Sequence, residues 1–307
     1  MNSALCFDNL SHRYGKNEAL HGLDMAVPRG SLYAFLGPNG AGKTTAIHVL
    51  MNLIHPSEGN STVLGVDSRR LGPAEVAQIG YVSENQKLPA WMTVAQLVSF
   101  CKPLYRSWDD DLCRRLLRQF DLPPECKIKS LSRGMKLKAA MVTALSFHPR
   151  LLVLDEPFGG LDAAVRDELV RGMLELADQD EWTLFISSHD LEDIENLVDY
   201  IGFLNNGRLI LSEELDRLRG RHCEVEVTLP EDARVPDNLP HAWVNLQVSH
   251  NLVRFTDTHY EERASASLIT KFFPGATDFF TKPLSLRSIF ILLARQSAGT
   301  ASEGGAA

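Results

Sequence analysis

A glycine-rich segment that ends in lysine and threonine is the strongest chemical signal in the sequence. Residues 37–44 read GPNGAGKT, which matches G-x-x-x-x-G-K-[ST] between an apolar run and a helix-forming run. Glycines let successive backbone N–H groups turn inward around a phosphate, and the following helix N-terminus adds positive potential. Lys43 is expected to reach the β- and γ-phosphates of a nucleotide, and the Thr44 hydroxyl to ligate magnesium. The alternative is a glycine-rich turn with a chance lysine.

Two adjacent carboxylates follow a second apolar run. Residues 151–154 read LLVL, and Asp155 and Glu156 come directly after them. Asp155 can hold magnesium through water, which leaves Glu156 free to orient or deprotonate an attacking water. An acidic strand end in solvent is the alternative, but the apolar run before Asp155 implies burial. The pattern therefore predicts a second half of the same site.

The segment Leu131–Met135 narrows the class of nucleotide-binding protein. It reads LSRGM, and at this point the chain resembles the ATP-binding-cassette (ABC) ATPases, whose signature LSGGQ opens a helix. Ser132 and Gly134 match the signature, whereas Arg133 and Met135 depart from it. The variant is similar to ATPases of bacitracin-, daunorubicin- and acetoin-type exporters. Ser132 can cap the helix, whose N-terminus is then an anion site, and the resemblance implies that it faces ATP held by the opposite subunit.

Three further residues match family positions in the family's order. Tyr14 precedes the glycine-rich loop where the family places an aromatic ring that stacks on adenine; a core tyrosine is the alternative. Asp162 ends a GGLD segment that resembles the family's D-loop, which lies across the dimer interface. His189 follows a strand where the family has a histidine that contacts the γ-phosphate.

Glu84 occupies a position where the family has a glutamine that contacts magnesium and the attacking water; Gln86 is near but out of register. The resemblance thus implies Glu156, His189 and Glu84 as catalytic residues and Thr44, Asp155 and Glu84 as magnesium ligands. The implied nucleotide contacts are Tyr14, Gly37, Pro38, Asn39, Gly40, Ala41, Gly42, Lys43, Thr44, Thr45, Ser132, Arg133, Gly134 and Asp162.

The order of elements predicts an α/β fold. Short apolar runs at 5–10, 20–27, 32–36, 151–154 and 183–187 are typical of strands, and helical patterns occupy 43–52 and begin again at Ser132. The resemblance implies a P-loop NTPase of the ABC type over residues 1–219, with a mixed sheet core and a helical subdomain at about 88–148. Alternating strands and two helical segments predict a small α+β domain over 220–296. Residues 297–307 are small and polar, so we expect a disordered tail.

Composition limits the partners. The 307 residues have a formal net charge of −8, which argues against a nucleic-acid partner. The five cysteines have neither metal-ligand nor redox spacing. The N-terminus lacks the pattern of a signal peptide, and no window reaches the roughly 18 apolar residues of a spanning helix.

Residues 87–92, KLPAWM, fit either ordinary core packing or a groove for a cytoplasmic helix of a membrane subunit.

The resemblance implies an ATPase that binds ATP and magnesium as a homodimer, or as a heterodimer with a second ABC ATPase. It would power transport through a separate integral membrane subunit, peripherally on the cytoplasmic side of the membrane, with export favoured over import. The alternatives are a soluble ABC ATPase that takes no part in transport and a catalytically inactive regulatory cassette. The substrate is not predicted, because substrate contacts in this family lie in the membrane subunit.

Overall fold

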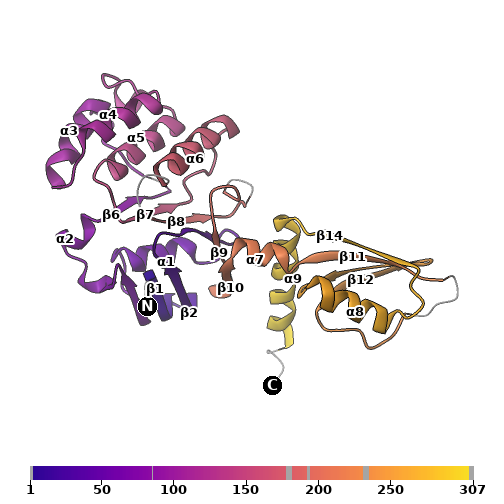
Figure 1. Ribbon diagram of the computed structural model, residues 1–307. Coiled ribbons are helices and arrows are strands. Elements are labelled where there is room, and N and C mark those ends of the chain that lie inside the picture. The colour runs from indigo at the N-terminus through magenta and orange to yellow at the C-terminus, as the bar shows by residue number, and fades with distance from the viewer. Residues whose placement is uncertain (1–2, 85, 178–181, 192–193, 231–234, 304–307) are drawn as a thin grey trace. The chain divides into compact units, whose positions relative to one another are not determined.

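The computed structural model describes residues 3–303 apart from 85, 178–181, 192–193 and 231–234 (Figure 1). The chain divides into two compact units, Met1–Ser212 and Glu213–Ala307. Among the described residues, no helix has the length and apolar character needed to cross a membrane.

A six-stranded sheet forms the centre of the first unit, and all its determined pairings are parallel. Its strand order is β10-β9-β3-β8-β7-β6. The two strands β7 and β8 are buried along their whole length, as continuous apolar runs predict for strands covered on both faces. The strands are β3 (Leu32–Leu36), β6 (Ile79–Val82), β7 (Leu151–Asp155), β8 (Thr183–Ser188), β9 (Tyr200–Asn205) and β10 (Arg208–Glu214).

A second, antiparallel sheet covers helix α1 (Lys43–Leu50), which lies against the six-stranded sheet on its other side. One buried cluster joins all three layers through Phe7 and Leu20 of the antiparallel sheet, Ile47 of α1, and Phe35 and Phe185 of the parallel sheet. The second sheet has the order β2-β1-β4-β5 and consists of β1 (Ser3–Tyr14), β2 (Asn17–Pro28), β4 (Glu58–Val63) and β5 (Val66–Asp67).

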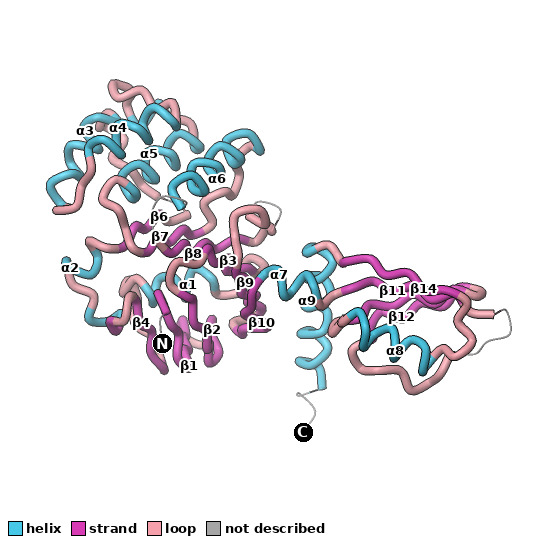
Figure 2. The backbone as a smooth tube through the Cα atoms, in the orientation of Figure 1, coloured by secondary structure: helices cyan, strands magenta, loops and turns pink. Residues whose placement is uncertain are grey.

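Three of the remaining helices of the first unit, α3, α4 and α5, begin at side chains that cap them. Thr93 accepts a hydrogen bond from the Gln96 N–H, Asp109 accepts from Leu112 N–H, and Ser132 accepts from Met135 N–H. Such caps satisfy backbone donors that the first turn of a helix leaves free. The helices, shown in cyan in Figure 2, are α2 (Pro73–Val76), α3 (Val94–Cys101), α4 (Asp110–Gln119), α5 (Arg133–Leu145) and α6 (Ala163–Ala177).

The second unit has a core of its own. Helix α8 packs on one face of a sheet of order β12-β13-β11-β14, and Trp243, Phe255 and Phe273 lie in the buried cluster between them. Its elements are α7 (Leu215–Gly220), β11 (Cys223–Thr228), β12 (Trp243–Ser249), β13 (Leu252–Asp257), α8 (Glu262–Phe272), β14 (Asp278–Pro283) and α9 (Leu286–Glu303).

Two features of this unit differ from the sequence-based expectation. The unit begins before α7, whereas the sequence predicts a boundary after residue 219, because the alternating strand pattern becomes visible only beyond α7. Helix α9 extends to Glu303, through most of the predicted disordered tail 297–307, because no proline interrupts it and the glycine in it costs only about 1 kcal/mol. Residues 304–307 lie outside the described residues.

Candidate active site

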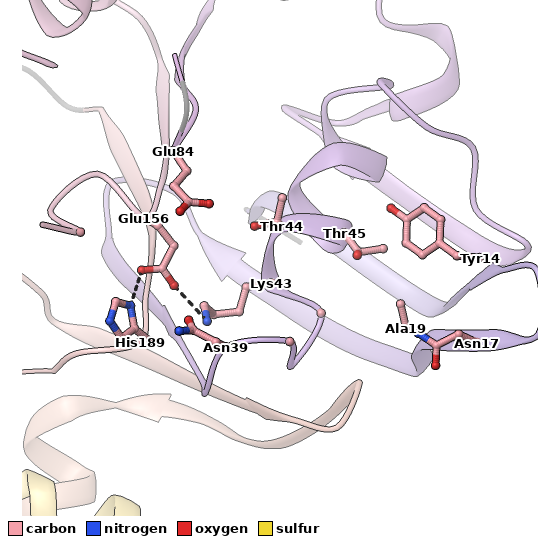
Figure 3. Close-up of a pocket in the computed structure, with 13 residues that line it drawn as sticks. Tyr14, Asn17, Ala19, Asn39, Lys43, Thr44, Thr45, Glu84, Glu156 and His189 are labelled. Atoms are coloured by element: carbon pink, nitrogen blue, oxygen red, sulfur yellow. Dashed lines mark hydrogen bonds and ion pairs between the residues drawn. The ribbon is translucent and has the colours of Figure 1, made fainter. Parts of the chain in front are cut away.

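One cavity of about 480 Å³ in the first unit collects most of the predicted site residues (Figure 3). Its lining comes from the β1–β2 turn, the glycine-rich loop, the start of α1 and the ends of three parallel strands. Because the carboxyl ends of parallel strands meet at one edge of the sheet, residues far apart in the sequence converge here. The lining residues are Tyr14, Asn17, Ala19, Asn39, Gly40, Gly42, Lys43, Thr44, Thr45, Glu84, Glu156, Gly159 and His189.

The glycine-rich loop requires its glycines. Gly40 and Gly42 have φ of 79° and 107°, in the left-handed region that favours glycine. A Cβ on Gly42 would lie 2.5 Å from the Ala19 carbonyl oxygen, and one on Gly37 would lie 2.2 Å from the Leu204 carbonyl oxygen. The loop therefore presents bare backbone at the N-terminus of α1, which is the geometry that binds phosphate groups.

Lys43 lies at the centre of the loop and is almost fully buried. Its Nζ donates to the carbonyl oxygens of Gly37 (2.7 Å) and Pro38 (3.1 Å) and lies 3.0 Å from Oε1 of Glu156. A buried ammonium needs such partners, because an unpaired charge away from water is costly. The same partners hold it at the mouth of the loop, where phosphate oxygens can replace them.

A hydroxyl and a carboxylate lie side by side behind Lys43. Thr44 Oγ1 and Ser187 Oγ donate to Oδ1 of Asp155, at 3.1 and 2.7 Å, and Asp155 is only 1% exposed. Hard cations prefer such oxygen ligands, and magnesium usually takes one or two of them from the protein and the rest from phosphates and water. The donor set therefore fits magnesium. Burial and the charge of Asp155 raise the pKa of the nearby Tyr81 to about 12, so that hydroxyl stays neutral at physiological pH.

Glu156 lies between two nitrogen-bearing side chains. One carboxylate oxygen faces Lys43, and the other lies 2.7 Å from Nδ1 of His189 (Figure 3). Its backbone has φ of 47°, an unusual value for glutamate, and the Ser187 hydroxyl accepts the Glu156 N–H at 2.9 Å. The sharp turn after β7 thus aims the second carboxylate into the cavity while Asp155 stays beneath it.

Tyr14 and Glu84 lie at different places along the cavity. Figure 3 shows Glu84 on the side of Thr44 and Glu156, and Tyr14 beyond Thr45. Tyr14 is 50% exposed, so it is not a core tyrosine, and its ring contacts His12 edge-on at 4.5 Å.

Gln86 does not line the cavity. Its side-chain oxygen accepts hydrogen bonds from the backbone N–H and the hydroxyl of Ser83.

Four predicted nucleotide contacts are not part of this cavity. Ser132, Arg133 and Gly134 lie at the start of α5, and Asp162 caps α6 by accepting the Val165 N–H at 2.9 Å. Ser132 and Arg133 are exposed. The predicted residues Gly37, Pro38, Ala41 and Asp155 are also absent from the lining. Gly37 and Pro38 instead hold Lys43 through their carbonyl oxygens, and Asp155 accepts the Thr44 hydroxyl.

Three contributors were not predicted from the sequence. Asn17 and Ala19 line the cavity because the β1–β2 turn brings them beside Tyr14, and a turn signal at Gly15 was the only local hint. Ser187 joins Asp155 and Glu156 from the neighbouring strand. Its position just before His189, at the end of an apolar run, was the available signal.

Comparisons with known proteins agree with the fold. The family model described as ABC transporter matches residues 20–159. The bacitracin transport ATP-binding protein BcrA of Bacillus licheniformis is 32% identical, over 72% of this chain and 73% of that protein. The lantibiotic transport ATP-binding protein SrtF of Streptococcus pyogenes is 33% identical, over 69% of this chain and 91% of that protein.

A solved structure of an ATP binding subunit of an ABC transporter superposes with a TM-score of 0.64 at 29% identity, over 71% of this chain and 92% of that chain. A bacterial ABC transporter cassette, MJ0796, has the same fold, with a TM-score of 0.62 at 22% identity over 69% and 98%. Because relatives of more than 30% identity match along more than two thirds of both chains, the chain belongs to the ABC transporter family, as an ATP-binding subunit that hydrolyses ATP.

Proposed function

We propose that two cassettes close head-to-tail around two ATP molecules with magnesium, and that hydrolysis powers export through a separate membrane subunit. The second cassette is another copy of this chain or a paralogous ATPase. The observation that supports the sandwich is the division of the predicted contacts. Lys43, Glu156 and His189 share one cavity, whereas Ser132 lies at an exposed helix N-terminus outside it. A helix N-terminus can bind an anion, and this one lies outside the nucleotide cavity of its own chain. It therefore suits a nucleotide that another chain holds.

Within each site, the side chains of this chain have separate tasks. Lys43 exchanges the Gly37 and Pro38 carbonyl oxygens and Glu156 for the β- and γ-phosphate oxygens of ATP. The released Glu156 oxygen accepts a proton from the attacking water, while His189 keeps the carboxylate oriented through its 2.7 Å contact. Magnesium, held by Thr44 and Asp155, would neutralise charge on the phosphates.

A set of exposed apolar side chains around α3 supports docking of this chain to a membrane subunit. Trp91, Phe100 and Leu104 are 70%, 58% and 62% exposed, whereas Met92 is buried. Within the 87–92 segment, Met92 thus lies in the core, whereas Trp91 is on the surface and is available for docking. Exposed apolar groups that gather in one segment usually mark an interaction site. Export is proposed because relatives include proteins named for bacitracin and lantibiotic transport.

Mixing two inactive variants tests the head-to-tail sandwich. Lys43→Ala removes the cation from a chain's own cavity, and Ser132→Arg blocks the helix N-terminus that serves the other chain's site. In a mixed dimer, one site contains both changes and the other contains neither. ATP turnover should therefore return when the two inactive variants are mixed, and it should stay absent in each alone. An inactive mixture, under conditions where tagged wild-type chains exchange partners, would contradict the sandwich.

A further inference from the structure

Strand β14 is an edge of the sheet in the second unit, and its sequence, DFFTKP, leaves two aromatic side chains exposed. Among the described strands it pairs only with β11 (Figure 1). Phe279 is 41% exposed and Phe280 is 64% exposed. Edge strands are usually protected by charges, prolines or bulges, because their free N–H and C=O groups attract another strand. In β14 such protection is confined to Asp278 at one end and to Lys282 and Pro283 at the other, and the two aromatic residues between them stay exposed, so this edge can accept a partner strand.

The hydrogen bonds of β11 show which of its residues face each neighbour. Leu284 N–H donates to the His222 carbonyl oxygen beyond the β14 end of the ladder, at 3.1 Å. Leu229 N–H donates to the Asn251 carbonyl oxygen on the β13 side, at 2.7 Å. Because hydrogen-bonded positions alternate in antiparallel pairs, even-numbered residues of β11 bond to β14 and odd-numbered residues bond to β13.

The same alternation fixes the free edge of β14. Phe280 is opposite Glu226 of β11, so the Phe280 backbone points inward, and the Phe279 and Thr281 backbones point outward. In agreement with this, the Phe279 N–H donates to the side chain of Asp278 at 2.8 Å rather than to β11. The open edge thus presents the N–H and C=O groups of Phe279 and Thr281.

The side chains of β14 form a self-complementary row. Asp278, Phe280 and Lys282 alternate along the strand and therefore share one face of the sheet. Read in the opposite direction, the row presents a positive charge, an aromatic ring and a negative charge. In an antiparallel pair of two such rows centred on Phe280, each Asp278 would therefore be opposite a Lys282, and the two Phe280 rings would be opposite each other.

We propose that β14 pairs antiparallel with β14 of a second copy of this chain, about a two-fold axis at Phe280. In this register, Phe279 exchanges hydrogen bonds with Thr281 of the partner subunit. The two Phe280 rings are opposite each other, and Asp278 is opposite Lys282 of the partner subunit. Opposite charges and aromatic pairs at directly opposed positions stabilise sheets. A register shifted by two residues would lose both charge pairs.

The pairing has a consequence that rests on the proposed head-to-tail closure. Both contacts are isologous, because each joins the same surface of two copies. The β14 pair would hold two cassettes together without ATP, at an effective concentration in the millimolar range if the connection between the units spans the distance. ATP would then close cassettes that are already paired.

Cysteine cross-linking of the full-length chain, in the absence of nucleotide, tests the register. Opposed residues of a non-hydrogen-bonded pair have Cα atoms about 4.5 Å apart, within the range of a disulfide. Phe280→Cys should form a reducible covalent dimer under mild oxidation. Val248→Cys, at a position 56% exposed on the opposite edge strand, is the matched control, and neither it nor the wild-type chain should form one.

Sedimentation of the same chain tests the charge pairs. Asp278→Lys and Lys282→Asp should each weaken the nucleotide-free dimer by roughly tenfold or more, and combining them should restore it, because the pairs reform with reversed sign. A wild-type chain that is monomeric without nucleotide at micromolar concentration would overturn the proposal. That result is also expected if β14 instead accepts an extended segment of a membrane subunit. The mixing of Lys43 and Ser132 variants reports on the ATP sandwich separately, so failure of one idea leaves the other measurable.

Discussion

At the scale of single residues, the proposed mechanism connects nucleotide binding with activation of water through the two oxygens of Glu156. Oε1 lies 3.0 Å from the Lys43 ammonium, and Oε2 lies 2.7 Å from His189. An oxygen engaged with Lys43 is not free to accept a proton from water. When phosphate oxygens take over Lys43, that oxygen becomes available while His189 still holds the other. In the proposed mechanism, the ion pair therefore keeps Glu156 occupied until ATP arrives.

The first prediction concerns this carboxylate. Glu156→Gln should bind ATP about as well as the parent, because the phosphate ligands are unchanged, and should lose hydrolysis by about 10²–10⁴-fold. An ATP-bound dimer should accumulate. ATP turnover and gel filtration with ATP measure the two effects, and Glu125→Gln, an exposed glutamate outside the cavity, is the control. Undiminished turnover in the Glu156 variant would remove it as the base.

The second prediction concerns Glu84. This carboxylate lines the cavity near Thr44, and its added negative charge needs a cation for neutralisation. Glu84→Gln should stay active and become less sensitive to low magnesium, whereas Glu84→Ala should lose stimulation by the membrane subunit. Turnover is measured across a magnesium titration, and Gln86→Ala is measured alongside because Gln86, which contacts Ser83, is the alternative residue for this role. If both Glu84 variants match the parent, the linking residue is another one, and Gln86 is the first candidate.

At the scale of elements, the start of α5 packs tightly on the segment that leads into α6. A Cβ on Gly134 would lie 2.9 Å from a methyl group of Val165. The Arg133 guanidinium lies directly over Gly160, and farther along the two helices Lys138 pairs with Glu168 at 2.6 Å. The resemblance implies that the start of α5 and the segment that leads into α6 both face the partner subunit. Because they pack against each other, they should move together.

Gly160→Ala tests this coupling. The substitution adds a methyl group 2.9 Å from the Arg133 guanidinium at φ of 70°, whereas Gly30→Ala adds one at φ of 74° with open space around it. Both should lower the free energy of unfolding by about 1–2 kcal/mol through backbone strain. Only Gly160→Ala should also lower ATP turnover, by roughly tenfold, because the displaced guanidinium disturbs the partner-facing segment. Adding Arg133→Ala should recover part of that loss if the contact is responsible.

Local patterns predicted the elements that have strong local signals. The apolar run 151–154 became β7, and the cap at Ser132 became the start of α5. Strand β14 was missed because DFFTKP does not alternate, and its pairing with β11 is a long-range contact. Likewise, the contribution of Ser187 to the site depends on the register of β8 beside β7, which no local pattern reports.

At the scale of the whole molecule, the two units have separate cores. Phe35 and Phe185 belong to the cluster of the first unit, and Trp243 and Phe255 to that of the second. The second unit also satisfies a buried carboxylate internally, since Asp257 accepts hydrogen bonds from Trp243 Nε1 and the Ser265 hydroxyl. Each unit thus has the burial and polar pairing that independent folding requires.

Attachment to a membrane subunit should depend on the first unit. Trp91→Asp places a charge among the exposed apolar side chains around α3, and a buried unpaired charge at an interface is costly. The variant should move from native membranes to the soluble fraction and keep its ATP affinity. Leu53→Asp, an exposed apolar position outside that segment, is the control. If the Trp91 variant stays with the membrane, the docking surface is elsewhere.

The second unit should be dispensable for catalysis and needed for pairing without ATP. A chain that ends at Gly220 keeps every residue of the cavity and loses β11 to β14 with their separate core. It should therefore bind ATP normally and turn it over at high protein concentration. At low concentration its turnover should fall steeply, because two free cassettes must meet in solution, whereas paired ones benefit from a high effective concentration. Turnover per chain, measured across a protein dilution series for the full and shortened chains, separates the two behaviours. Parallel dilution curves would mean that the second unit does not hold the cassettes together.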